Sequence, residues 1–162
     1  SIEKHTHRFI FFGVSISKRQ KKENGCTHDN STCLFAFLLL RMFVVVSQGQ
    51  LEVAAWLLSV LEVPHQVACV TQNKQANTPM HFACRGGHLE VCEWLFSKGA
   101  GQDCRTPNAY GWTPMHSAHW KSHAHITNWL MTDEVGAAPD MEAEDNEGHT
   151  PLYWAQRAKA GN

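Results

Sequence analysis

The chain contains 162 residues, 43% of them hydrophobic, and has a formal net charge of −1. This length is enough for one domain of ordinary size or for a short array of repeats, and a net charge so close to zero gives no reason to expect nucleic acid as the main partner. The six cysteines include no Cys-x-x-Cys pair and no signal peptide is recognisable. We therefore expect a reduced, intracellular setting, the cytoplasm rather than the nucleus.

Residues 1–39 contain no repeat, and we expect them to be poorly ordered or outside the domain. The basic run Lys18–Lys22 resembles a weak nuclear address, but a solvated tail is the simpler interpretation. The apolar stretch Cys33–Val46 has 14 residues and includes Arg41, whereas a spanning helix needs roughly 20 apolar residues. We therefore favour a buried helix over a membrane span. A signal anchor remains an alternative, because the chain does not begin with Met.

Two short sequence markers recur along the rest of the chain. The first is a Thr-Pro dipeptide followed by an apolar residue, and it begins at Thr78, Thr113 and Thr150, at spacings of 35 and 37 residues. The second ends in Trp-Leu and contains Trp56, Trp94 and Trp129, at spacings of 38 and 35 residues. In both units that contain the two markers, Trp follows Thr by 16 residues. A fixed internal distance indicates one repeated structural unit.

Each unit has the pattern of two helices joined by a tight turn. Thr-Pro is a helix start, because the Thr side chain can cap the first turn and Pro fixes φ where its missing N–H costs nothing. Gly86 and Gly87 end that helix after about two turns. The segment Leu89–Ser97 then has helical spacing of apolar residues and ends near Gly99. Such a pair cannot bury its apolar faces alone, but stacked copies can.

A turn signature precedes each Thr-Pro. Asn108–Thr113 and Asp145–Thr150 both have Asn or Asp three residues before Gly and five before Thr, which is typical of a hairpin turn. The copy that begins at Asn73 has Ala76 in place of the Gly. If the backbone there requires positive φ, Ala76 is strained by about 1 kcal/mol.

The chain resembles an ankyrin-repeat protein, on the evidence of TPMHFACRGGHLEVCEWLFSKGA (78–100), GWTPMHSA (111–118) and EGHTPLYWA (147–155). The resemblance covers residues 40–161 and implies an all-α solenoid of helix-turn-helix units with short hairpin loops. It implies three to four repeats, with units at about 40–72, 73–107, 108–144 and 145–161, of which the first and last are incomplete. Tyr153 and Ser122 depart from the motif, which has His and Gly at those positions.

The resemblance also assigns roles to residues. His81 and His116 correspond to a structural strut, whose ring bonds to the Thr at the helix start and to neighbouring backbone. The structural positions of the motif are Thr78, Pro79, His81, Gly87, Thr113, Pro114, His116, Thr150 and Pro151.

In this family the inner face of the first helix and the hairpin tips form a concave binding surface. In this chain that surface contains Phe82, Arg85, Tyr110, Trp112, Ser117, Trp120, Lys121, His149, Trp154 and Arg157. Aromatic residues and Arg dominate the centres of protein interfaces. Packing between repeats is the alternative for Phe82 and Trp154. We expect Trp112→Ala and Trp120→Ala to abolish partner binding and to leave the melting temperature nearly unchanged.

Other chemistry is weakly indicated. His116, His119, His123 and His125 suggest a metal site, but His116 and His123 are repeat positions and the helix should break near Ser122.

Cys26, His28 and Cys33 are a weak cluster in the N-terminal segment, and Cys84 and Cys92 fall at buried positions. We interpret the Trp series as core packing in equivalent surroundings. No phosphate loop, nucleophile or acid–base pair is recognisable, so we expect no enzyme activity, cofactor or metal.

The function that the resemblance implies is a non-enzymatic scaffold that binds a protein partner and acts as a monomer. The alternative is a recognition domain from a larger enzyme or membrane protein, of the kinase, ubiquitin ligase or channel type, whose catalytic part is absent from this chain. Fold alone does not name the partner.

Overall fold

The computed structural model describes residues 41–61 and 72–160. These residues belong to one compact unit of the chain, Phe35–Asn162. The expectations for residues 1–39, for most of the apolar stretch before residue 41 and for the cluster Cys26, His28 and Cys33 lie outside the described residues. Within the described part every regular element is helical, which confirms the all-α repeat architecture.

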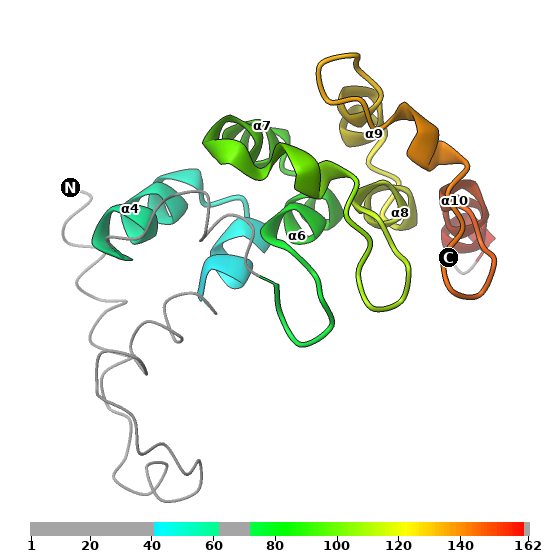
Figure 1. Cartoon of the computed structure of the whole chain (residues 1–162), viewed down its shortest axis with the longest axis horizontal. Helices are drawn as coiled ribbons and strands as arrows, with labels where there is room; N and C mark the ends of the chain where they lie inside the picture. The colour runs from blue at the N-terminus through cyan, green and yellow to red at the C-terminus, as the bar shows by residue number, and fades with distance from the viewer. Residues whose placement is uncertain (1–40, 62–71, 161–162) are drawn as a thin grey trace, which may run out of the picture. The chain divides into compact units, whose positions relative to one another are not determined.

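The helices alternate between two rows (Figure 1). The first helices of the units are α6 (Pro79–Gly86), α8 (Pro114–Trp120) and α10 (Pro151–Ala160), preceded by a helix at residues 41–47 that lacks a Thr-Pro start. The second helices are α4 (Leu51–Leu61), α7 (Leu89–Leu95) and α9 (Ala124–Leu130). α6 packs against α8 and α8 against α10, while α4 packs against α7 and α7 against α9. Short helical turns follow α7 and α9 at Phe96–Ala100, Gly101–Cys104 and Ala138–Met141.

The turn between the two helices of a unit needs a left-handed residue. Gly87 has φ +77° and ends α6, and Ser122 adopts φ +58° at the equivalent position after α8. The next residue in each unit is a histidine whose ring lies over the preceding unit. His88 Nε2 donates to the carbonyl of Ser47 at 3.0 Å, and His123 Nε2 donates to the carbonyl of Arg85 at 3.1 Å. These bonds join the start of each second helix to the neighbouring unit.

The core repeats along the stack. Met80 and Met115, which follow the Thr-Pro starts, are both fully buried, and Cys84 and Cys92 are buried as the sequence predicts. Complete burial of an apolar side chain of this size contributes about 1.5–3 kcal/mol. The two thiols lie 3.8 Å apart, and burial raises the pKa of Cys84. Leu152, at the position of the two methionines, is 53% exposed on α10.

The three tryptophans of the second helices occupy the same local position but not the same surroundings. Each tryptophan carbonyl accepts a bond at 2.7 Å from the hydroxyl three residues later. The donors to Trp56, Trp94 and Trp129 are Ser59, Ser97 and Thr132. Trp94 and Trp129 pack against the core, whereas Trp56 is 38% exposed. The expectation of equivalent surroundings is therefore wrong for Trp56. Trp129 gains an edge contact with Phe96 at 6.0 Å, and no ring among the described residues pairs with Trp56.

Candidate functional site

The hairpins that precede α6, α8 and α10 are built by one device. The first residue of each hairpin is Asn73, Asn108 or Asp145, and its Oδ1 accepts two backbone hydrogen bonds at 2.9 to 3.0 Å. The donors are the N–H groups two and four residues later. Short polar side chains that bond their own backbone in this way define turns. The chain therefore repeats one turn conformation three times.

Backbone hydrogen bonds also join successive hairpins. The N–H of Ala109 donates to the carbonyl of Gln75 at 2.9 Å, and the N–H of Asn146 donates to the carbonyl of Tyr110 at 3.0 Å. The two bonds use the same positions of the repeat. They hold the hairpin tips, and the side chains on them, at fixed positions relative to one another.

His81 connects a helix start to the next hairpin. Thr78 and His81 form a capping box, in which ring Nδ1 lies 3.2 Å from the Thr78 backbone N and 3.0 Å from its hydroxyl. Nε2 lies 2.9 Å from the carbonyl of Trp112. Since a carbonyl only accepts, Nε2 carries the proton and Nδ1 accepts. His116 repeats this arrangement with Thr113 and with the carbonyl of His149, at 3.2 Å.

The neutral ring that this geometry requires makes stability depend on pH. Burial lowers the pKa of His81 from 6.5 to about 4, although the bond to the Trp112 carbonyl acts in the opposite direction. The unfolded chain therefore binds a proton more readily than the folded chain between those two pH values. The contribution of the neutral His81 ring to the free energy of unfolding is therefore complete above pH 6.5, and it is lost as the pH falls towards 4.

We expect His81 to account for a loss on the order of 3 kcal/mol between pH 6.5 and pH 4. Urea unfolding at half-unit pH intervals measures it. In His81→Gln, glutamine keeps a capping-box side chain that does not titrate. The plot of the free energy of unfolding against pH should therefore be flatter for this variant between pH 6.5 and pH 4. An equally steep curve in His81→Gln would show that the ring is not the source.

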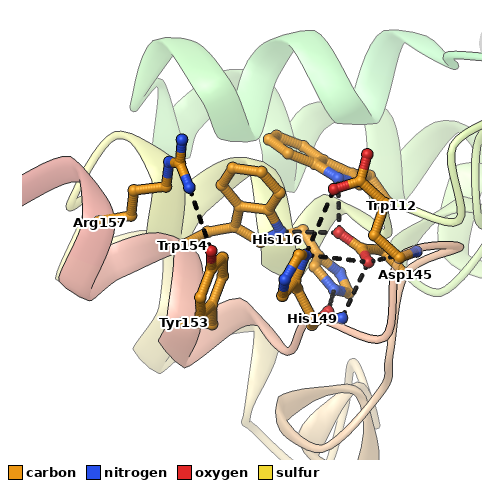
Figure 2. A network of polar contacts seen from close by, with 8 residues as sticks. Trp112, His116, Asp145, His149, Tyr153, Trp154 and Arg157 are labelled. Atoms are coloured by element: carbon orange, nitrogen blue, oxygen red, sulfur yellow. Dashed lines mark hydrogen bonds and ion pairs between the residues drawn. The ribbon is translucent and has the colours of Figure 1, made fainter.

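Asp145 differs from its equivalents Asn73 and Asn108 by its charge and by a second set of bonds (Figure 2). Its Oδ2 accepts from the indole N–H of Trp112 at 3.1 Å and of Trp154 at 2.8 Å. The side chain is 2% exposed. Burial acts to raise the pKa of Asp145, but the bonds from the His149 backbone and the Trp154 indole outweigh it, and the pKa is lowered. A buried carboxylate thus orients two indoles.

Three indoles form a contiguous cluster. The ring centroids of Trp112 and Trp154 are 4.8 Å apart, those of Trp120 and Trp154 5.3 Å, and those of Trp112 and Trp120 5.8 Å. These distances are direct ring contacts, each of which contributes to stability. The expectation that Trp112→Ala leaves the melting temperature nearly unchanged is therefore revised, because that change removes the ring contacts with His116, Trp120 and Trp154 and one donor to Asp145.

The C-terminal edge of the cluster is formed by α10. Tyr153 stands where α6 and α8 have the strut histidine, and its ring stacks on His149 at 3.9 Å with an interplanar angle of 7° (Figure 2). Arg157 donates to the Tyr153 hydroxyl at 3.1 Å, and its guanidinium lies 5.9 Å from the Trp154 ring. The departure from the motif at Tyr153 thus replaces a buried strut with an aromatic stack.

A groove of about 340 Å³ runs between the hairpins and the first helices. Six of the predicted surface residues line it, namely Phe82, Arg85, Tyr110, Trp112, Ser117 and Trp154. A second hollow of about 320 Å³ adjoins it, shares Phe82 and Arg85 with it, and adds Lys121. Trp120, His149 and Arg157 each contact Trp154. The structure therefore brings all ten predicted residues to one surface, which we call the groove face.

The ten residues are not equally accessible. Arg85, Tyr110, Lys121 and Arg157 are exposed, Tyr110 by 60%. Ser117 is buried, which differs from the expectation of an accessible contact residue, because α8 lies between α6 and α10. The other five are half-buried. Phe82 packs against Phe43 at 5.3 Å and against the core, so part of its surface belongs to the interior.

Sequence reasoning missed the polar residues of the groove, which are Asn77, Asn108, Asp145, Asn146 and Glu147. All of them lie on the hairpins. One signal could have found Asp145: in the aligned repeats it is the only acidic residue at a position otherwise occupied by Asn.

Of the histidines around Ser122, the rings of His123 and His125 meet at 5.7 Å, but the others do not join them. His119 Nδ1 bonds the carbonyl of Met115 at 3.1 Å, and His125 Nε2 bonds that of Gly87 at 2.8 Å. Across residues 41–61 and 72–160, no three His, Cys, Asp or Glu side chains are placed to hold a metal ion.

None of the helices in the described ranges is both long enough and apolar enough to cross a membrane. Compared with protein families, residues 42–143 match the model for ankyrin repeats, in three copies. A search of curated proteins found no match.

Proposed function

Because the chain belongs to the ankyrin-repeat family, whose repeats generally mediate protein–protein interactions and are typically non-catalytic, we propose that it is a non-enzymatic scaffold that binds a protein partner through the groove face. The observation that carries the proposal is the immobilised aromatic surface. Trp112 and Trp154 are fixed by Asp145, and Tyr110 beside them is 60% exposed. A rigid aromatic surface loses little conformational entropy on binding.

We also propose that the chain acts as a monomer in a reducing compartment, the cytoplasm. The buried free thiols Cys84, Cys92 and Cys104 support this setting.

A photo-crosslinking amino acid placed at Tyr110 tests the function. We expect it to capture one partner protein, and the same probe at Asn128, on the exposed side of α9, to capture none of it. The purified partner should then bind Tyr110→Ala at least about tenfold more weakly than the original chain, a cost of about 1.4 kcal/mol that is common for an exposed interface Tyr. Asn128→Ala should bind normally. Equal capture from both positions would place the interface elsewhere.

A further inference from the structure

The second hollow of the groove face is positively charged. It is lined by Ser47, Phe82, Arg85, Gly86 and Lys121, with two cations and no carboxylate. Arg85 and Lys121 are exposed, and neither forms an ion pair with another described residue. Arg85 lies in the last turn of α6, where a cation is favoured by the helix dipole. Lys121 is the C-cap residue of α8, so the same effect favours a cation there, and the two helix ends bring both cations to one hollow.

The opposite end of the groove face has little negative charge available to a ligand. Both oxygens of Asp145 are occupied, Oδ1 by two backbone N–H groups and Oδ2 by two indoles. Glu147 is exposed, and its carboxylate lies 3.5 Å from the His149 ring. Besides Arg85 and Lys121, the exposed charged side chains of the groove face are Arg157 on α10 and Glu147 on the last hairpin, so only the second hollow brings two cations together.

An aromatic wall separates the two ends. Phe82 borders both hollows, and Trp112 and Trp154 continue the wall towards the hairpins. The amide side chains of Asn77 and Asn146 also line the groove, but they serve the hairpins: Asn77 Oδ1 accepts from Asn108 at 2.7 Å, and Asn146 Nδ2 donates to the Ala109 carbonyl at 2.9 Å. An extended peptide presents successive side chains about 3.3 Å apart along its length. It can therefore place one side chain in the hollow and a nearby one on the wall.

We propose that the groove face takes an extended acidic peptide, with an Asp or Glu side chain between Arg85 and Lys121 and a bulky apolar side chain on the wall formed by Phe82, Trp112 and Trp154. This inference rests on the proposed function and adds the chemical class of the partner. The carboxylate makes charge-assisted hydrogen bonds to two cations that have no other partner among the described residues. The apolar side chain is removed from water against fixed indoles.

Selection of a random twelve-residue peptide library displayed on yeast, against the intact chain, tests the inference. We expect selected peptides to be enriched in Asp or Glu within three positions of Leu, Phe, Tyr or Trp. A synthetic peptide from the selection is then titrated against the chain by tryptophan fluorescence. Arg85→Glu and Lys121→Glu should each weaken it at least about tenfold. Lys98→Glu, which changes the charge equally on the turn after α7, should alter its Kd less than about twofold.

The outcomes separate the inference from the proposed function. Enrichment in Lys or Arg, a Kd unaffected by Arg85→Glu and Lys121→Glu, or a selection without binders would overturn the acidic peptide. The Tyr110 crosslinking result would still stand in those cases. Peptides that depend on Arg85 and Lys121, together with a Tyr110 probe that captures nothing specific, would support the peptide site and reject the wider protein interface. Arg85→Gln is a milder variant if Arg85→Glu fails to fold by circular dichroism.

Discussion

Asp145→Asn should destabilise the chain by about 3 kcal/mol, although the two side chains are nearly isosteric. The buried side chain accepts bonds on both oxygens, two from backbone N–H groups and two from indoles. An amide has one accepting oxygen, so in either orientation its NH₂ group faces two N–H donors. Hydrogen bonds to a charged group contribute about 1.5–3 kcal/mol, and each buried donor left unpaired costs about 1–3 kcal/mol.

Urea unfolding followed by circular dichroism measures this loss, and tryptophan fluorescence should report the freed indoles of Trp112 and Trp154. Asn73→Asp is the matched control, because Asn73 occupies the same hairpin position and bonds its own turn through Oδ1. It should change stability by less than about 0.5 kcal/mol. If Asp145→Asn were equally neutral, the carboxylate would not be what holds the two indoles.

Gly111→Ala should cost at least about 3 kcal/mol, the sum of a backbone penalty and a collision. Gly111 has φ +79°, where an alanine costs about 1–2 kcal/mol. The added Cβ would also lie 2.7 Å from the backbone N of Asn146 and 3.0 Å from the carbonyl carbon of Asp145. Backbone atoms cannot rotate away as a flexible side chain can. The bond between the two hairpins is therefore expected to break.

The same hairpin position in the other units separates the two costs. Gly148 has φ +80°, and a Cβ added there would meet no atom within 4 Å, so Gly148→Ala should lose only about 1–2 kcal/mol. Ala76 has φ +56°, and Ala76→Gly should gain about 1 kcal/mol. Urea unfolding should therefore show the largest loss of stability for Gly111→Ala, a smaller loss for Gly148→Ala and a gain for Ala76→Gly. Equal losses for Gly111→Ala and Gly148→Ala would show that the collision relaxes without cost.

The sequence was sufficient to predict features that depend on neighbours within a few residues. The Thr-Pro starts, the turn at Gly87 and the positive φ expected at Ala76 all follow from local backbone preferences, and the repeat spacing extends them to each unit. The grouping of the ten surface residues followed from the family resemblance. It required only that equivalent positions lie side by side, which stacking ensures.

Features that depend on distant partners could not be predicted. The indole of Trp112 meets Asp145 33 residues later, and no local pattern links the two. Ser117 on α8 is the repeat equivalent of Phe82 on α6, which is half-buried. The side chain of Ser117 is smaller, and the neighbouring helices cover it so that only 5% of the residue is exposed. Trp56 matches Trp94 in sequence, but Trp94 packs against the core whereas Trp56 is 38% exposed, a difference that depends on contacts outside the repeated segment itself.

The histidine bonds across the stack have a consequence for how the chain comes apart. His81 and His116 reach forward to the next hairpin, while His88 and His123 reach back to the previous first helix. Removing one unit therefore strips bonds from both of its neighbours. Local fluctuations should spread inward from whichever end opens first, and amide protons of α6 and α8, each of which has a first helix on both sides, should be the slowest to exchange with solvent.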